Sequence, residues 1–185
     1  MKSVLMKFTK LIPLALFAAL SLSAQTPYKM AIVGLVHAHV WGHVDEILKG
    51  KDVTLVGVAE PNPDLQAEAK KAGIPEALIS SDYKKMLDEK KPDLIWAFVE
   101  NNRHLEIVEF AAARKINVIF EKPLASSYKD ALKIQELAQK SGIKIMCNYQ
   151  MAFWPANYTA KRLSDSGALG QVYRLHGIVG HGGPG

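Results

Sequence analysis

The sequence predicts an α/β fold built on a doubly wound parallel sheet, and two observations support this prediction. Short apolar runs rich in Val, Ile, Leu and Phe are nearly continuous rather than alternating, which is typical of parallel strands buried on both faces. Amphipathic stretches of helical length separate these runs, and such alternation implies right-handed crossovers. Apolar residues make up 49% and charged residues 22% of the 185-residue chain, which is ordinary usage for a globular protein.

Residues 1–24 have the pattern of a secretory signal peptide. Lys2, Lys7 and Lys10 precede an apolar stretch that ends in small residues. This stretch is shorter than the about 20 residues that span a membrane, so an uncleaved anchor is the less favoured alternative. We expect Sec-type export to a periplasmic or extracellular location, with no membrane association after cleavage.

Strand-like and helix-like segments alternate through residues 25–150. Gly142 follows the last of these helices, where a C-terminal cap favours a left-handed residue, and Ser126 and Ser127 offer N-caps at its start. The predicted strands are 28–33, 53–59, 94–99, 118–120 and 144–147. The predicted helices are 39–49, 64–72, 83–89, 104–115 and 128–141.

The pattern changes after residue 150. Residues 155–166 predict a linking helix, glycines interrupt the chain at 167–170, and residues 171–179 predict one further strand. A single strand cannot form a domain. We therefore expect residues 151–185 to be a linking helix and the first strand of an incomplete second domain.

Charge and cysteine content exclude several classes of protein. The net charge of +5 falls to +2 without the three leader lysines, and no run of Lys or Arg offers a nucleic acid a basic surface. Cys147 is the only cysteine, so the chain can form neither an intrachain disulfide nor a cysteine-based zinc site. Its apolar neighbours predict a small buried hydrophobic residue rather than a nucleophile.

The turn after the first predicted strand favours binding of a dinucleotide pyrophosphate. Gly34 matches the first glycine of a G-x-G-x-x-G motif, whereas Val36 and His39 occupy the other two glycine positions, with His37 between them. On this motif alone, an ordinary tight turn is the alternative. Glu60 ends the second strand, where a carboxylate can accept both ribose hydroxyls and repel a 2'-phosphate, which favours NAD over NADP. A solvated loop acid is the alternative for Glu60.

Two further stretches place polar residues at strand ends. Residues 101–104 read Asn-Asn-Arg-His, and Glu121, Lys122 and Pro123 stand at the end of the fourth predicted strand. In a doubly wound sheet the strand carboxyl ends open onto the ligand crevice, where buried charges have a use. A lysine there can donate or accept a proton beside a carbon that undergoes hydride transfer.

These motifs together resemble the N-terminal half of the Gfo/Idh/MocA oxidoreductase family over residues 28–180. The resemblance rests on residues 58–61, 101–104, 121–125 and 165–172, in the family's order and spacing. It implies a Rossmann-type dinucleotide-binding domain at residues 25–150 with NAD as its cofactor. It also implies that residues 151–185 are the beginning of a truncated α+β substrate domain, whose further catalytic residues lie beyond this chain.

The resemblance also assigns roles to single residues. It implies that Lys122 is the catalytic residue beside the nicotinamide and the substrate hydroxyl, and that Pro123 follows a cis peptide bond. It places Asn101 and His104 in the lining of the cofactor cleft, and Glu121 among the cofactor-binding residues. The chain departs from the family pattern at the reduced glycine motif and at Val99-Glu100, where Thr-Pro is common.

The histidines near the glycine turn admit a metal site as an alternative. His37, His39 and His43 follow an H-x-H-x-x-x-H pattern, and Asp45 is the only nearby acid with ligand spacing. Because no other carboxylate completes the set, we expect phosphate contact or plain packing, and no metal.

We therefore expect the full-length protein to be an exported, NAD-dependent oxidoreductase that acts on a sugar or polyol, and the 185-residue chain by itself to be inactive. NAD is scarce outside the cytoplasm, so the cofactor is expected to stay tightly bound and to be recycled, either between two substrates or within an NAD-dependent glycosidase cycle. A homo-oligomer is compatible with this reading, whereas a nucleic-acid partner is not. The alternative is a noncatalytic nucleotide- or sugar-binding protein on the same fold.

Overall fold

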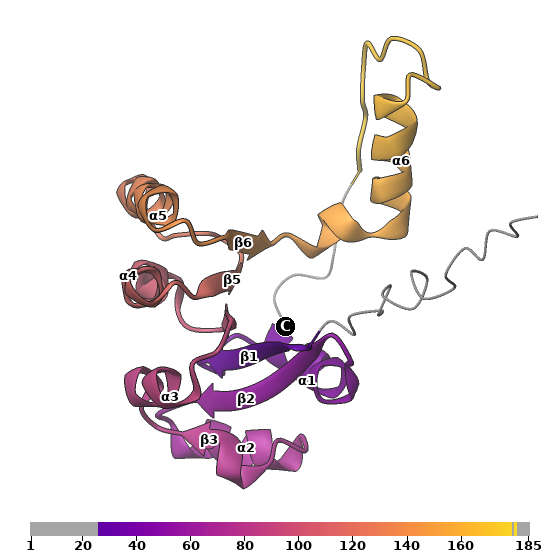
Figure 1. Cartoon of the computed structure of the whole chain (residues 1–185). Coiled ribbons are helices and arrows are strands. Elements are labelled where there is room, and N and C mark those ends of the chain that lie inside the picture. Colours follow the sequence, from indigo (N-terminus) through magenta and orange to yellow (C-terminus); the bar gives the residue numbers. More distant parts are fainter. Residues whose placement is uncertain (1–25, 179, 181–185) are drawn as a thin grey trace, which may run out of the picture.

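A parallel six-stranded sheet forms the centre of the protein, with strand order β3-β2-β1-β4-β5-β6 (Figure 1). The computed structural model describes residues 26–178 and residue 180, so the predicted leader lies outside the described residues. The strands are β1 (Tyr28–Val33), β2 (Val53–Ala59), β3 (Ile79–Ser80), β4 (Leu94–Ala97), β5 (Asn117–Glu121) and β6 (Ile145–Asn148). The predicted α/β class and parallel sheet are confirmed.

Helices cover both faces of the sheet, which makes it doubly wound. Val40 and Val44 of the first helix pack with β1 and β2 in one buried cluster, while Met86, Ile107 and Ile134 of three later helices belong to a second cluster on the other face. The helices are α1 (His39–Lys49), α2 (Pro63–Lys71), α3 (Tyr83–Lys90), α4 (His104–Arg114), α5 (Tyr128–Ser141) and α6 (Pro155–Asp165).

Local sequence signals account for where several helices begin and end. The side chain of Asn62 caps α2 by accepting a hydrogen bond from the Asp64 amide, and the Ser127 hydroxyl caps α5 by accepting one from the Asp130 amide at 3.1 Å. Gly142 ends α5 in the left-handed conformation, with φ of 75°. Helix α1 differs, because its N-terminus has no side-chain cap and no acidic residue in its first turn.

The strand order reverses between β1 and β4, and this switch point positions the candidate site. Chain segments on either side of it leave toward opposite faces of the sheet, which opens a crevice at the strand carboxyl ends. Because all the strand pairs are parallel, the residues that follow β1, β2, β4, β5 and β6 meet along one edge of the sheet.

The chain beyond β6 is exposed. Every described residue from 151 to 178 is exposed, and Figure 1 shows α6 standing away from the sheet. The predicted strand at 171–179 is wrong over its described part, because residues 171–178 form neither helix nor strand. A strand requires a hydrogen-bonding partner, and no described strand runs beside this segment.

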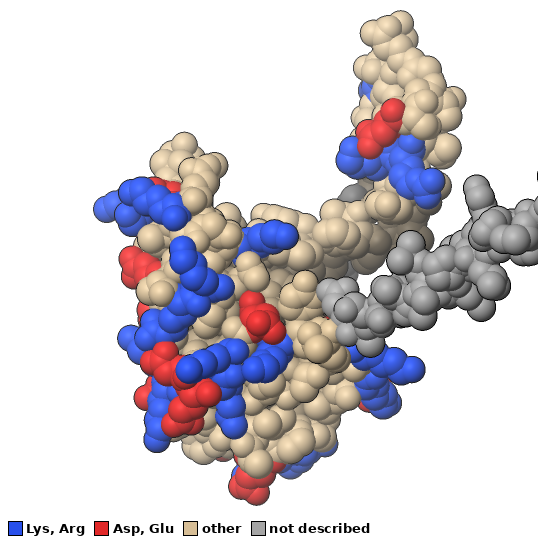
Figure 2. Space-filling view, in the orientation of Figure 1, with Lys and Arg blue, Asp and Glu red and all other residues tan. Residues whose placement is uncertain are grey.

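Two observations complete the description. Among the described residues, no helix is both long and apolar enough to cross a membrane. On the face in view, Lys and Arg side chains are interspersed with Asp and Glu around α3 and α4 (Figure 2).

Candidate functional site

The turn after β1 comes unusually close to the loop after β4. Gly34 has φ of +79°, and a Cβ at this position would lie 2.5 Å from Cγ1 of Val99. A larger residue would therefore clash as well as strain the backbone. The amide of Gly34 donates to the Ala59 carbonyl at 2.8 Å, which ties the turn to β2.

Glu60 links the tip of β2 to the same turn. Its side chain is buried, with 2% exposed, and Oε2 accepts a hydrogen bond from the Leu35 amide at 2.7 Å. Oε1 accepts another from the Asn62 amide at 2.8 Å. The carboxylate therefore shapes the turn, and its contact with a ribose stays a prediction.

The remaining turn amides are only partly available to a ligand. The His37 amide donates to the Phe98 carbonyl at 3.1 Å, so it is used within the fold as the Leu35 amide is. Val36 lies between them with its side chain 51% exposed. A pyrophosphate at this turn would therefore meet an exposed valine where the motif has a glycine.

A cavity of about 260 Å³ opens beside Gly34 at the carboxyl ends of the strands. Pro61 follows β2, Asp82 precedes α3 and Arg103 follows β4, so three loops contribute to its wall. This position at the switch point fits one half of a dinucleotide.

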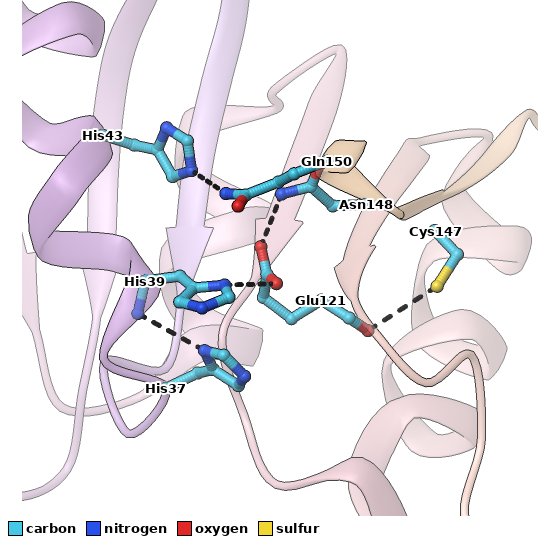
Figure 3. Close-up of polar contacts among 7 residues, drawn as sticks. All are labelled: His37, His39, His43, Glu121, Cys147, Asn148 and Gln150. Atoms are coloured by element: carbon cyan, nitrogen blue, oxygen red, sulfur yellow. Dashed lines mark hydrogen bonds and ion pairs between the residues drawn. The ribbon is translucent and has the colours of Figure 1, made fainter. Parts of the chain in front are cut away.

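Glu121 lies at the centre of a second group of polar residues (Figure 3). It ends β5 with its side chain 0% exposed, and Oε2 lies 2.9 Å from Nδ1 of His39. Oε1 accepts a hydrogen bond from Nδ2 of Asn148 at 2.7 Å. Residues from α1, β5 and β6 are therefore joined at one buried carboxylate.

His37 completes this group on the cleft side. Its ring centroid lies 4.5 Å from that of His39, and candidate ligand atoms of His37, His39 and Glu121 all lie within 4.8 Å of one another. Burial lowers the pKa of His37, and the neighbouring His39 lowers it further against the opposing charge of Glu121. His37 is therefore held toward its neutral form.

The three histidines of the H-x-H-x-x-x-H pattern do not form one cluster in the structure. His43 lies outside the cluster, with Nε2 3.2 Å from Nε2 of Gln150, and Asp45 pairs with Lys49. His37 and His39 instead meet Glu121, which is 82 residues beyond His39 in the sequence. The sequence-based expectation of no metal overlooked this carboxylate.

Lys122 and Pro123 follow the buried carboxylate on an exposed loop. The Lys122–Pro123 peptide bond is cis, as the family resemblance implies. Both side chains are exposed, whereas Glu121 is buried, so the chain passes from the core to the cleft within one residue. The Lys122 charge also contributes to lowering the pKa of His37, after burial and His39, which places the two side chains near each other.

The structure corrects the expected position of His104. Its side chain is 0% exposed, its ring stacks on Phe120 with centroids 4.3 Å apart, and Nδ1 lies 3.0 Å from the Leu124 carbonyl oxygen. A ring enclosed in this way cannot line a cleft, and it supports the loop after Lys122 instead. Asn101, at the start of the turn before α4, is half-buried, and its contact with a cofactor stays a prediction.

Sequence reasoning missed Asn148 and Gln150, and it predicted Cys147 to be more buried than it is. Asn148 stands opposite Glu121 in the β5–β6 register, and a polar residue at a strand carboxyl end was the available signal. Cys147 is partly buried, and burial raises the pKa of its thiol. A thiol that resists ionisation is a poor nucleophile.

Comparisons with known proteins match this geometry. Residues 28–149 match the Gfo/Idh/MocA model, described as an oxidoreductase family with an NAD-binding Rossmann fold. An uncharacterized oxidoreductase of Schizosaccharomyces pombe is 32% identical over 108 residues, which are 58% of this chain and 29% of that protein. Levoglucosan dehydrogenase of Pseudarthrobacter phenanthrenivorans is 28% identical over 121 residues, which are 65% of this chain and 30% of that protein.

Solved structures show the same architecture. Scyllo-inositol dehydrogenase from Lactobacillus casei, with bound NAD(H) and scyllo-inositol, superposes with a TM-score of 0.67 at 24% identity, over 78% of this chain and 42% of that one. Aldose-aldose oxidoreductase from Caulobacter crescentus superposes with a TM-score of 0.65 at 25% identity, over 78% and 44% of the two chains. This chain thus spans less than half the length of these relatives. The match over residues 28–149 shows that it belongs to the Gfo/Idh/MocA oxidoreductase family, with its NAD-binding Rossmann fold.

Proposed function

We propose that the protein is an NAD-dependent oxidoreductase that acts on a sugar or polyol. The observation that supports this most strongly is the position of Lys122, exposed at the carboxyl end of β5 on the strand edge that also carries Gly34. A lysine there can exchange a proton with a hydroxyl group, which is the partner step to hydride transfer. The names of the inositol and levoglucosan dehydrogenases agree with a polyhydroxylated substrate.

The chain's own residues would divide the work of binding. Gly34 would let the backbone approach the pyrophosphate, Glu60 would face the ribose, and Asn101 would contribute from the β4 loop. When bound, NAD supplies the hydride acceptor. The carboxylate of Glu60 at the tip of β2 disfavours a 2'-phosphate, which favours NAD over NADP.

Export would determine how the cofactor is used. The leader-like pattern of residues 1–24 supports a periplasmic or extracellular location, where a released NAD could not readily be replaced. We expect a retained cofactor that is returned to its starting state within each cycle. A second substrate could complete the cycle, or the same sugar could do so after a transient ketone has assisted cleavage of a glycosidic bond.

Release of the cofactor on unfolding tests this proposal. The purified protein is denatured, and NAD(H) in the supernatant is measured by absorbance and mass spectrometry, with about one NAD per chain expected. In the full-length protein, Lys122→Met should lower turnover by about 10²- to 10⁴-fold and leave the NAD content unchanged. Lys129→Met, which removes an exposed lysine of α5, is the matched control. Loss of activity in both variants, or in neither, would contradict the role of Lys122.

A noncatalytic nucleotide- or sugar-binding protein is the second candidate. It is favoured by the internal use of the Leu35 and His37 amides, which leaves few turn donors for a pyrophosphate. This candidate predicts no NAD release, no thermal shift with NAD or NADP, and a thermal shift with a sugar alone. The same samples therefore separate the two functions.

A further inference from the structure

We propose that His37, His39 and Glu121 form a binding site for one divalent transition-metal ion. Two residues of the glycine turn and the last residue of β5 bring their ligand atoms within 4.8 Å of one another. Two imidazoles and one carboxylate are the ligand types that Zn²⁺ and Fe²⁺ take in sites that keep coordination positions open.

The distance between His39 and Glu121 suits ligands of the same ion. Two metal–ligand bonds of about 2.1 Å place their donor atoms about 3.4 Å apart at a tetrahedral angle and about 3 Å apart at a right angle, the angle of an octahedral site. Nδ1 of His39 and Oε2 of Glu121 are 2.9 Å apart. An ion could therefore replace the hydrogen bond between these atoms with little movement of either side chain.

The charge of Glu121 supports the presence of a cation. The carboxylate is 0% exposed, and among the described residues its only ion-pair partner is His39, whose own side chain is 40% exposed. A buried carboxylate is costly unless a positive charge compensates it. A protonated His39 would supply one charge and a divalent ion two, so the ion neutralises the group without requiring a protonated imidazole.

Asn148 provides the outer support that such sites need. Its Nδ2 donates to Oε1 of Glu121 at 2.7 Å, which fixes the carboxylate and directs Oε2 toward His39. Groups that orient a ligating carboxylate commonly change metal affinity by about 10- to 100-fold when they are removed. Asn148 is itself 9% exposed and held in the β5–β6 register, so its orientation is determined by the sheet.

The open positions would face the cleft. His37 lies on the turn before α1 and His39 is the first residue of α1, and both are half-buried, whereas Glu121 and Asn148 are buried. Oxygen atoms of a hydroxylated ligand or of water would complete the coordination of the ion.

Metal titration of the full chain tests this site directly. The chain is purified without a polyhistidine tag, stripped with a chelator, and titrated with Co²⁺ by visible spectroscopy and with Zn²⁺ by calorimetry. We expect about one ion per chain and a Co²⁺ spectrum with nitrogen and oxygen ligands. No NAD or substrate is added, so the result is independent of the oxidoreductase proposal.

Four substitutions localise the ion. Glu121→Gln keeps an acceptor for Asn148 but removes the charge, and His39→Gln removes one imidazole, so each should abolish the Co²⁺ spectrum. Asn148→Ala should weaken Zn²⁺ binding by about 10- to 100-fold. His43→Gln is the matched control, because His43 lies one turn along α1 and pairs with Gln150 instead.

The outcomes that would overturn the site are equally definite. The proposed site is wrong if the metal-free wild-type chain does not bind Co²⁺ at millimolar concentration. Equal loss of metal binding in His43→Gln and His39→Gln would also contradict the site, since the ion would then lie elsewhere on the chain. Circular dichroism of each metal-free variant separates loss of the site from loss of the fold, and Glu121→Gln preserves the most of the surrounding contacts.

Discussion

Two glycines of the first βα unit differ in what a side chain would meet. At Gly34 the backbone has φ of +79°, and a Cβ would lie 2.5 Å from Cγ1 of Val99, whereas a Cβ at Gly42 of α1 would meet nothing within 4 Å. Substitution by alanine should therefore have opposite effects on the free energy of unfolding at these two positions.

Gly34→Ala should lower the free energy of unfolding by about 1–3 kcal/mol, from backbone strain, with any clash adding to it. Gly42→Ala should raise it by about 1 kcal/mol, because alanine is the better residue in an exposed helix. Urea unfolding of the two variants measures both values. A stabilised Gly34→Ala would show that the turn is not tightly packed.

Burial of His104 predicts how stability depends on pH. Burial lowers the pKa of this ring, against the opposing hydrogen bonds to carbonyl groups such as that of Leu124. The unfolded chain therefore binds a proton at a higher pH than the folded chain does. The free energy of unfolding falls as pH decreases through the histidine pKa of the unfolded chain, about 6.5. This decrease in stability ends once the pH is below the lowered pKa of His104 in the folded chain.

His104→Gln should flatten this pH dependence. Glutamine has an amide that can donate to the Leu124 carbonyl, and it does not titrate. We expect the variant to be less stable than the wild type at pH 7.5, and to lose less further stability between about pH 7 and pH 5. Thermal unfolding across this range gives the comparison. If the dependence of stability on pH is the same in the variant and the wild type, another group, such as His37, causes the loss of stability at low pH.

At the scale of single elements, helix α5 depends on one capping hydroxyl. The Ser127 Oγ accepts a hydrogen bond from the Asp130 amide at 3.1 Å, whereas Ser126 precedes the cap on the exposed loop. Ser127→Ala should lower the free energy of unfolding by about 1 kcal/mol, and Ser126→Ala should change it by less than about 0.5 kcal/mol. Equal effects of the two substitutions, measured by urea unfolding, would show that Ser127 is not the capping residue of α5.

At the scale of the whole molecule, stability comes from the two clusters that sandwich the sheet and not from α6. Leu87 of α3 is 1% exposed within one cluster, whereas Leu163 of α6 is 44% exposed. Leu87→Ala should cost about 2–5 kcal/mol, because it leaves a cavity. Leu163→Ala should stay within about 0.5 kcal/mol of the wild type. A large loss at Leu163 would show that α6 packs on a surface in solution.

Most of this architecture could be predicted from the sequence because it follows local patterns. Helix α1 has the bounds that hydrophobic spacing predicts, and helix α5 begins and ends at its predicted caps. The predicted strand ends differ from the observed ones by at most two residues. Strand β3 was missed because Ile79–Ser80 is too short to form an apolar run. The segment at 171–178 reads as a strand, but no local signal shows whether a strand has a neighbour.

The candidate site was only partly predictable for a related reason. Glu121 and Lys122 stand out because charged residues are unexpected at the end of a buried strand. The pairing of Glu121 with His39 depends on how β1 and β5 flank β4, and that arrangement is a property of the sheet rather than of either motif. His104 was placed in the cleft by the family resemblance, whereas its burial is decided by Phe120 and the loop after Lys122.

The support of Glu121 by the last strand of the sheet has a consequence for motion. Within the described part of the chain, strand β6 is an edge strand that pairs only with β5, and edge elements open locally at a lower free energy than central ones do. An opening of β6 would withdraw Asn148 and leave the Glu121 carboxylate free to rotate while β1 and β4 stay folded. The opening rate of β6, which amide hydrogen exchange reports, would then limit how quickly the chain gains or loses a ligand at this carboxylate.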